Sequence, residues 1–170
     1  MIFTSESGLT DPGRLAEWDE WYLGHLAAMA AVTGIASAQR FRALIEGVPP
    51  SLAMYTVESA AVFDSEIYRR TRGMGPFVPV VDERLHRRNL FDGLDAAPVV
   101  AMGGILLVAD RDVQGPAQKD IVWLRAVGLD HSTAYRGIGV FPDVATAQAA
   151  GAKLGGTVAV YAPMTARFEG

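Results

Sequence analysis

The stretch Trp18-Asp19-Glu20-Trp21-Tyr22-Leu23-Gly24-His25 indicates a helix that carries polar side chains on its inward face. Six residues in and around it follow one another at spacings of 3, 4, 3, 4 and 3: Leu15, Trp18, Tyr22, His25, Met29 and Val32. This spacing places them on one side of an α-helix. Asp11 is a suitable N-cap, Pro12 a suitable first residue, and Gly34 follows the expected end near Val32. A histidine and a tyrosine are therefore expected on the side that faces the core.

Extended segments are expected before and after this helix. Residues 1–4 form a first strand, and the sequence alternates with a period of two from Ile35 to Arg42. A turn at Gly47-Val48-Pro49-Pro50 leads to a strand over 52–57. A second helix, capped by Ser59, is expected over 60–70, and a fourth strand over 84–91. This order, β-α-β-β-α-β, is typical of a ferredoxin-like fold.

The rest of the chain is expected to repeat this order in shortened form. The expected elements are a strand over 103–110, a short helix over 116–127, an extended segment over 129–141, a helix capped by Asp143 and a strand over 157–168. A glycine and an arginine stand eight residues apart in both halves, at Gly34 and Arg42 and at Gly128 and Arg136. One ferredoxin-like unit leaves a sheet face bare, and two such faces can close a barrel. We therefore expect an α+β fold in which tandem ferredoxin-like repeats, residues 1–95 and 96–170, form a dimeric-type α+β barrel within one chain.

Composition excludes several classes of protein. Of the 170 residues, 50% are hydrophobic and 20% are charged, which is typical of a folded domain. The net charge of -4 gives no reason to expect nucleic acid as a partner. The absence of cysteine excludes disulfides and thiolate metal sites. No apolar run is long enough to span a membrane, and no secretory signal is visible after Met1. We expect a cytoplasmic protein that does not associate with membranes.

Several short motifs resemble the EthD-like branch of the dimeric α+β-barrel superfamily. They are Trp21-Tyr22-x-x-His25, Val32-Thr33-Gly34, Arg40-Phe41-Arg42 and Ala53-Met54-Tyr55-Thr56-Val57-Glu58-Ser59, in this order within residues 1–92. That superfamily includes small cofactor-free monooxygenases, isomerases, cyclases and decarboxylases that act on aromatic or polyketide-like compounds. The resemblance implies a pocket for a small-molecule ligand, without a cofactor, and we also expect a homodimer. Asp120 stands opposite His25 when the two halves are aligned, so the site is expected in the N-terminal half.

His25 is the leading candidate for a catalytic residue. An imidazole has an unperturbed pKa of about 6.5, so it can act as a base or an acid near neutral pH. Between a helix and a sheet it could take a proton from a phenol, an enol or an activated methylene. The alternative is a histidine that hydrogen-bonds a buried backbone group or a tyrosine. Tyr22, also a candidate catalytic residue, either donates a hydrogen bond to substrate or packs in the core.

The candidate substrate-binding residues are Trp18, Trp21, Met29, Tyr55 and Arg42. The aromatic residues and the methionine would form the walls of the pocket, and the alternative is that they only fill the core. Arg40 and Arg42 share a strand face opposite Phe41. They face solvent or a partner subunit if Phe41 points into the core, whereas the opposite register would let a guanidinium bind a carboxylate. Asp19 and Glu20 are expected on the solvated side of the helix.

The roles of other basic residues are open at this stage. Six arginines between Arg69 and Arg88 form either a local anion site or a solvated surface. His86 and His131 show no metal-ligand spacing, so no metal site is expected. The Gly103-Gly104 pair precedes a strand and not a helix, which is unlike a nucleotide-binding loop.

These patterns favour a cofactor-independent enzyme, or an enzyme-like pocket, that uses a histidine for proton transfer on an apolar, aromatic or carbonyl-bearing small molecule. Isomerase, cyclase, lyase and monooxygenase-like reactions all stay open. The alternatives are a ligand-binding or stress-associated protein without turnover, and a structural homo-oligomer. A cavity with His25 at its wall favours a ligand-binding site. A filled core with His25 bonded to the backbone favours a structural role.

Overall fold

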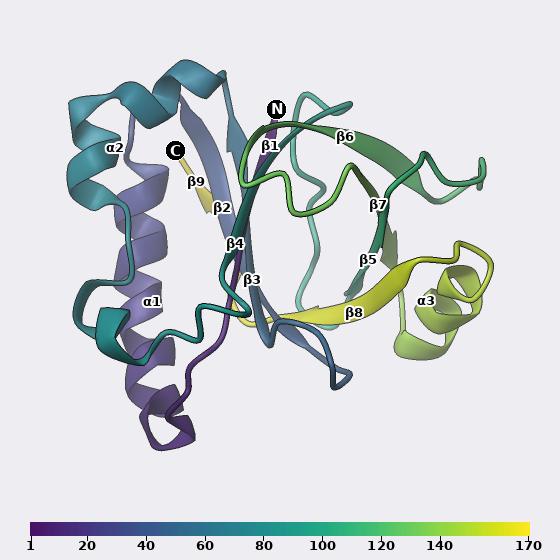
Figure 1. Cartoon of the computed structure of the whole chain (residues 1–170), viewed down its shortest axis with the longest axis horizontal. Helices are drawn as coiled ribbons and strands as arrows, with labels where there is room; N and C mark the ends of the chain where they lie inside the picture. Colours follow the sequence, from purple (N-terminus) through teal and green to yellow (C-terminus); the bar gives the residue numbers. More distant parts are fainter.

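Successive side chains of the first and third strands face two different hydrophobic cores in the computed structural model, which describes residues 1–170. Ile2, Leu52 and Met54 belong to one core, whereas their neighbours Phe3 and Tyr55 belong to the other. Strands alternate their side chains between the two faces of a sheet, so each face can be buried against a different partner. One partner here is the opposite wall of a barrel, and the other is a layer of helices (Figure 1).

The first half of the chain follows the predicted order. Its main elements are β1 (Ile2–Ser7), α1 (Leu15–Ala30), β2 (Ile35–Ala43), β3 (Ser51–Val57), α2 (Glu66–Thr71) and β4 (Arg87–Asp92). Three 3-10 helices accompany them: η1 (Pro12–Arg14), η2 (Ala60–Asp64) and η3 (Gly75–Val80). The strands pair in the order β4-β1-β3-β2, and α1 and α2 cover the outer face of this sheet (Figure 1).

The second half has the same strand pairing with one helix fewer. Its elements are β5 (Ile105–Arg111), β6 (Val122–Leu129), β7 (Tyr135–Phe141), α3 (Val144–Gly151), β8 (Thr157–Pro163) and β9 (Phe168–Glu169). β5 lies between β7 and β8, and β6 lies on the other side of β7, which gives the order β8-β5-β7-β6. The strand orders of the two halves thus correspond, and the division into two ferredoxin-like repeats near residue 95 stays a prediction.

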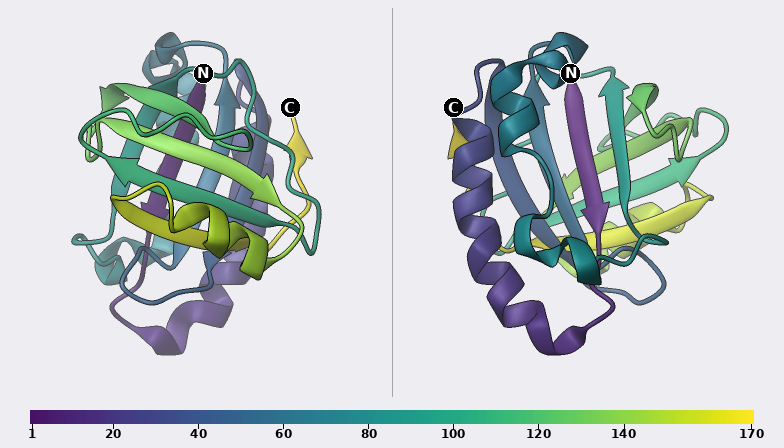
Figure 2. Two further views of the ribbon diagram at one scale, coloured as in Figure 1. Left: turned by 90° about the vertical axis from the view of Figure 1, so that its right-hand side faces the viewer. Right: turned by 60° about the vertical axis from the view of Figure 1, so that its left-hand side comes forward.

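The two halves join edge to edge and close a barrel. β4 pairs with β6, and β2 pairs with both β8 and β3. The second-half strands cross in front of the first-half strands at a steep angle (Figure 2). Phe41, Phe91, Leu106 and Tyr161 are among the side chains that fill the space between them. A third core lies between α3 and the outer face of the second half, around Leu107 and Leu154.

The predicted helix over 116–127 is wrong. Gly115-Pro116 is a typical helix start, but the structure has irregular chain there and then β6, which pairs antiparallel with β4 and β7. The motif shared by the two halves also fails as a structural alignment. Gly34 directly precedes β2 and Arg42 lies within it, whereas Gly128 lies within β6 and Arg136 lies on β7. The match in spacing therefore joins elements that are not equivalent.

Smaller corrections concern the ends of elements. The helix predicted over 60–70 is broken at Ser65, which has extended backbone angles and accepts a hydrogen bond from the Tyr68 amide. Ser59 makes no such capping bond. On α1 the inward stripe holds for most of its members, but Leu15 is 41% exposed. Asp143 caps α3 as predicted, whereas Asp11 caps the 3-10 helix η1 that precedes α1.

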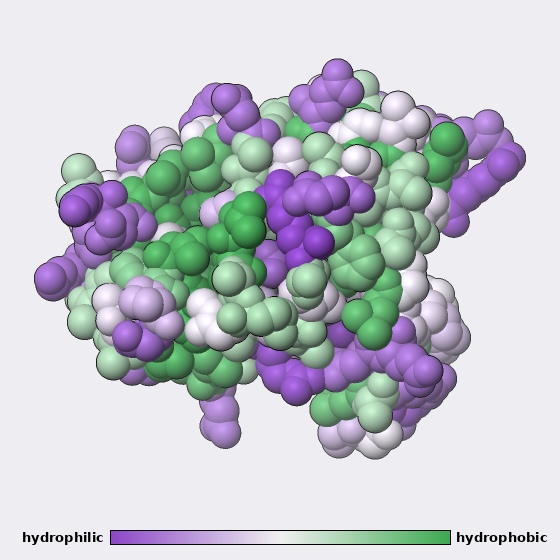
Figure 3. Space-filling view, turned by 180° about the vertical axis from the view of Figure 1, so that it is seen from behind, coloured by the Kyte–Doolittle hydropathy of each residue, from purple (hydrophilic) through white to green (hydrophobic).

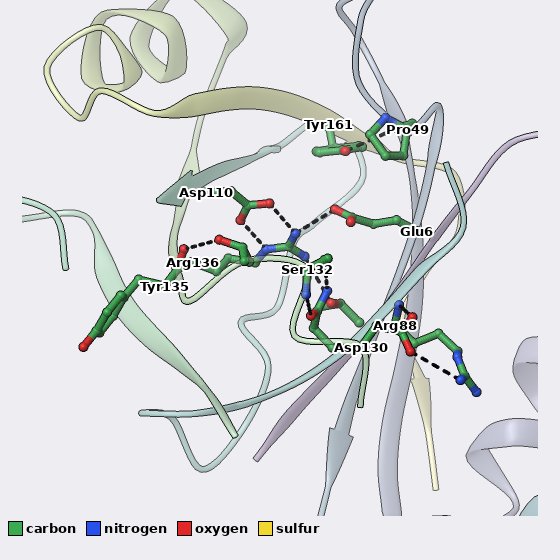
Figure 4. A network of polar contacts seen from close by, with 12 residues as sticks. Glu6, Pro49, Arg88, Asp110, Asp130, Ser132, Tyr135, Arg136 and Tyr161 are labelled. Carbon is green, nitrogen blue, oxygen red and sulfur yellow. Dashed lines mark hydrogen bonds and ion pairs between the residues drawn. The ribbon is translucent and has the colours of Figure 1, made fainter. Parts of the chain in front are cut away.

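The barrel interior holds a charged cluster that sequence reasoning did not foresee. The guanidinium of Arg136 is fully buried and donates to Oε1 of Glu6 at 2.8 Å and to Oδ2 of Asp110 at 2.7 Å (Figure 4). A further bond reaches Oγ1 of Thr4 at 3.1 Å. Burial raises the pKa of Glu6, and the charge of Arg136 opposes that shift. This cluster ties β1, β5 and β7 together across the barrel.

The outer surface gives no sign of a membrane-spanning helix. None of the helices combines the length and the apolar character that crossing a bilayer would require. Seen from behind, the surface mixes hydrophobic and hydrophilic residues, with a compact hydrophilic group near its middle (Figure 3).

Candidate functional site

A cavity of about 400 Å³ lies between α1, the α2 region and the outer face of the first-half sheet. Its walls carry aromatic, sulfur-containing and basic side chains, and no acidic side chain lines it. The lining residues are Phe3, Ser5, Tyr22, His25, Met29, Tyr55, Tyr68, Arg69, Arg72, Gly73, Met74, His86 and Arg88. Small-molecule sites in proteins typically have volumes of roughly 300–1,000 Å³, so this cavity is large enough for a ligand.

His25 reaches this cavity from the middle of α1. Its ring stacks on Trp21 with 4.8 Å between centroids and meets the Tyr22 ring edge-on at 5.5 Å. The imidazole makes no hydrogen bond to the protein, in contrast to the structural alternative considered above. Burial lowers the pKa of His25 to about 4. The ring is therefore neutral near pH 7, with one nitrogen able to accept a proton and the other able to donate one.

Two buried phenols lie on the same cavity. Tyr22 and Tyr55 are each 1% exposed, and Tyr55 stacks on Phe3 with 5.1 Å between ring centroids. Burial raises the pKa of Tyr22, against the opposing effect of the nearby charge on Arg40. Burial also raises the pKa of Tyr55, to well above its usual value. Both hydroxyl groups therefore stay protonated at neutral pH and can donate hydrogen bonds to an oxygen in the cavity.

Half of the arginines between Arg69 and Arg88 lie at the cavity. Arg69 pairs with Asp64 at 3.1 Å, and Arg88 pairs with Asp130 at 3.4 Å. Arg72 has no carboxylate within ion-pair distance. Arg70, in contrast, pairs with Glu66 on the surface, outside the cavity. Of the six arginines between Arg69 and Arg88, three thus line the cavity and three do not.

The structure brings together four of the seven residues singled out from the sequence. His25, Tyr22, Met29 and Tyr55 line the cavity, whereas Trp18, Trp21 and Arg42 do not. Trp21 lies behind His25, and Trp18 packs under the guanidinium of Arg40 at 4.5 Å. Arg42 is 58% exposed and pairs with Asp19. We therefore leave these three residues out of the proposed binding set.

Arg40 contradicts the expected solvent exposure. Phe41 points into the barrel as expected, but the Arg40 side chain on the opposite face is only 2% exposed. It pairs with Asp19 at 2.9 Å, donates to Ser51 at 3.0 Å and lies 4.1 Å from the ring centroid of Tyr22. Asp19 was expected on the solvated side of α1, and it instead bridges Arg40 and Arg42.

Sequence reasoning missed the wall opposite α1. Phe3 and Ser5 come from β1, and Tyr68 and Met74 come from the α2 region. His86 was expected within a fourth strand over 84–91, but it precedes β4, which lies between β1 and β6. The alternation in β1 could have indicated that Phe3 and Ser5 share a face with Tyr55. The segment 72–86 has no regular period, so its residues could not have been placed.

Comparison with known proteins gives the fold. No protein-family model and no curated protein sequence matches the chain. A solved structure described as an anthrone oxidase-like protein has a TM-score of 0.63 at 11% identity, covering 99% of this chain and 92% of that one. A candidate chlorite dismutase has a TM-score of 0.59 at 10% identity, with 96% and 95% covered. The chain has the dimeric α+β-barrel fold.

A third structure extends the same comparison. A candidate monooxygenase from Lactobacillus acidophilus NCFM has a TM-score of 0.57 at 9% identity, with 96% of this chain and 94% of that one covered. At such low identity a dimeric α+β-barrel likeness establishes architecture and not chemistry. The chemistry of the site depends on the residues that line its cavity.

Proposed function

We propose that the chain is a small-molecule enzyme that uses His25 for proton transfer on an aromatic, carbonyl-bearing substrate. One observation carries the proposal: the His25 ring lines a cavity of about 400 Å³ and makes no hydrogen bond to the protein. A partly buried imidazole without a protein partner is available to a bound molecule. The aromatic rings around it suit a flat, largely apolar ligand.

The proposed reaction begins with the removal of a proton next to a carbonyl group. Neutral His25 accepts a proton from an acidic C–H or O–H of the substrate. Negative charge then develops on the carbonyl oxygen, where a hydroxyl of Tyr22 or Tyr55 donates a hydrogen bond. Arg72 adds a positive charge at the same cavity. A base with a pKa of about 4 is weak, so the reaction depends on this stabilisation of the anion.

The names of the structural neighbours suggest a suitable probe. One neighbour is described as anthrone oxidase-like and another as a candidate monooxygenase. Anthrone has a methylene group flanked by two aryl rings and conjugated through them to a carbonyl, so it has the activated C–H that the proposal requires. Removal of that proton gives an electron-rich carbanion of the kind that reacts with oxygen.

Deuterium exchange measures the proposed step directly. Anthrone in D2O without oxygen is followed by NMR, and the protein is expected to accelerate loss of the methylene proton signal. His25→Gln is expected to abolish the acceleration. His131→Gln is the matched control, because His131 is exposed and does not line the cavity. Equal exchange by wild type and His25→Gln, or equal loss in both variants, would contradict a catalytic role for His25.

The low pKa of His25 also favours a second candidate, a ligand-binding protein without turnover. Such a protein would bind the probe in the same cavity and leave the exchange rate unchanged. Homodimerisation, a cytoplasmic location and membership of the EthD-like branch are predictions from the sequence that we retain as parts of the proposal. Size measurement in solution tests the first of them.

A further inference from the structure

The basic wall of the His25 cavity carries one more positive charge than its acidic neighbours neutralise. Arg69, Arg72 and Arg88 line this wall. Two carboxylates outside the cavity pair with them, Asp64 with Arg69 and Asp130 with Arg88. Arg72 has no such partner. One guanidinium is therefore free to bind an anion in a cavity that no acidic side chain enters.

The histidines do not add to this charge. His25 is neutral near pH 7, and burial also lowers the pKa of His86, with the charge of Arg88 acting in the same direction. The excess at the wall is thus a single positive charge. Arg72 is exposed to solvent where it lines the cavity, and its single positive charge is matched by a singly charged carboxylate.

The apolar part of the lining favours an aromatic body. Phe3 and Tyr55 stack on each other, and Met29 and Met74 are almost fully buried beside the same space. Aromatic rings and thioethers pack well against flat aromatic ligands. A ligand that contacts both the apolar and the basic side chains of the lining therefore needs an aromatic part and an anionic group.

We propose that this cavity binds an aromatic monocarboxylate, with the carboxylate on Arg72, beside Arg69 and Arg88, and the ring against Phe3 and Tyr55. The inference rests on the proposed function only in sharing its cavity, and it names the class of substrate. A guanidinium binds a carboxylate through two parallel hydrogen bonds, which gives orientation as well as affinity. The reacting part of such a substrate would then extend toward His25 on α1.

Calorimetric binding of two matched probes tests this inference. The probes are 2-naphthoate and 2-naphthamide, which have the same ring and nearly the same shape but differ in charge. We expect 2-naphthoate to bind wild type at least tenfold more tightly, because a hydrogen bond to a charged group contributes more than one to a neutral group. Arg72→Met is expected to reduce this preference to about twofold or less.

Arg70→Met is the control for general electrostatic attraction. Arg70 is two residues from Arg72 but pairs with Glu66 and has a side chain that is 78% exposed. This variant is expected to keep the full preference for 2-naphthoate. Equal affinity for the two probes, no binding of either, or the same loss in both variants would overturn the inference.

Failure of this inference and failure of the proposed function can be told apart. Neither naphthalene probe has an activated methylene, so their binding does not depend on proton transfer. A preference for 2-naphthoate without anthrone exchange would leave the aromatic carboxylate site standing and reject catalysis by His25. Anthrone exchange without any preference for 2-naphthoate would support catalysis by His25 and reject the aromatic carboxylate site.

Discussion

The indole of Trp21 and the imidazole of His25 lie parallel on α1, with 4.8 Å between centroids and 13° between planes. They are four positions apart in the sequence, so they are neighbours on one side of the helix. Trp21 also contacts Phe77 of η3, and a Cβ added to Gly75 would come within 2.9 Å of the indole. The indole is therefore held between η3 and His25. Trp21 stacks on one face of the His25 ring and so restricts the orientation of this candidate base, although Trp21 does not line the cavity.

Stability should depend on pH through His25. Its pKa is lowered from 6.5 in the unfolded chain to about 4 in the folded one, so the unfolded chain takes up the proton first. The contribution of His25 to the free energy of unfolding is therefore fully present above pH 6.5 and is lost as the pH falls toward 4. The total loss is at most about 3 kcal/mol. Urea unfolding of wild type and His25→Gln at several pH values measures it.

The difference between those two proteins isolates the histidine from other titrating groups such as Glu6 and His86. We expect the stability of wild type relative to His25→Gln to be constant above pH 7 and to decline between about pH 6.5 and 4. A constant difference across this range would show that burial does not perturb His25.

Arg136→Met should destabilise the barrel strongly. The substitution leaves the carboxylates of Glu6 and Asp110 without their buried cation, and one Glu6 oxygen already lacks a partner. Removing one member of a buried ion pair typically costs about 3–5 kcal/mol. Arg70→Met, which removes an exposed pair, should cost less than about 1 kcal/mol. Thermal and urea unfolding compare the two, and a similar small loss in both would contradict the importance of the buried cluster.

Arg40 and Arg42 should differ although they share Asp19. Arg40→Met removes a buried ion pair, a hydrogen bond to Ser51 and contacts with two aromatic rings, so a loss of about 2–4 kcal/mol is expected. Arg42 is exposed, and Arg42→Met should change the free energy of unfolding by less than about 1 kcal/mol. Equal losses in chemical unfolding would indicate that burial of Arg40 contributes nothing.

Local signals were sufficient for the first half of the fold. Asp11 and Pro12 marked a helix start, and the spacing from Trp18 to Val32 placed its buried side. Period-two alternation located β2, and a turn at 47–50 followed by strand-forming residues located β3. The second half shows the limit of this approach. Gly115-Pro116 is a helix-start signal, but pairing of the following residues with β4 and β7 decides in favour of β6, and that pairing joins distant segments.

The candidate site was predictable in part for the same reason. His25, Tyr22 and Met29 follow from helical spacing, and Tyr55 follows from strand alternation. Arg40 and Arg42 have the same strand parity, yet one is buried and the other exposed. Both pair with Asp19, and what distinguishes Arg40 is its packing against Trp18 and Tyr22 of α1, which strand parity does not reveal. The role of Arg72 could not be read from the sequence, because it depends on which neighbouring arginines already have acidic partners.

NMR titration of the His25 ring tests the central claim most directly, since that claim is a neutral imidazole at the wall of a ligand cavity. The ring faces Tyr22 and Trp21 on its own helix, and Arg69, Arg72, His86 and Arg88 line the same cavity. In the free protein we predict a pKa of about 4 for His25. Bound 2-naphthoate should shift the ring signals and raise that pKa, because a nearby anion favours the protonated form. A pKa near 6.5 that 2-naphthoate leaves unchanged would contradict the account.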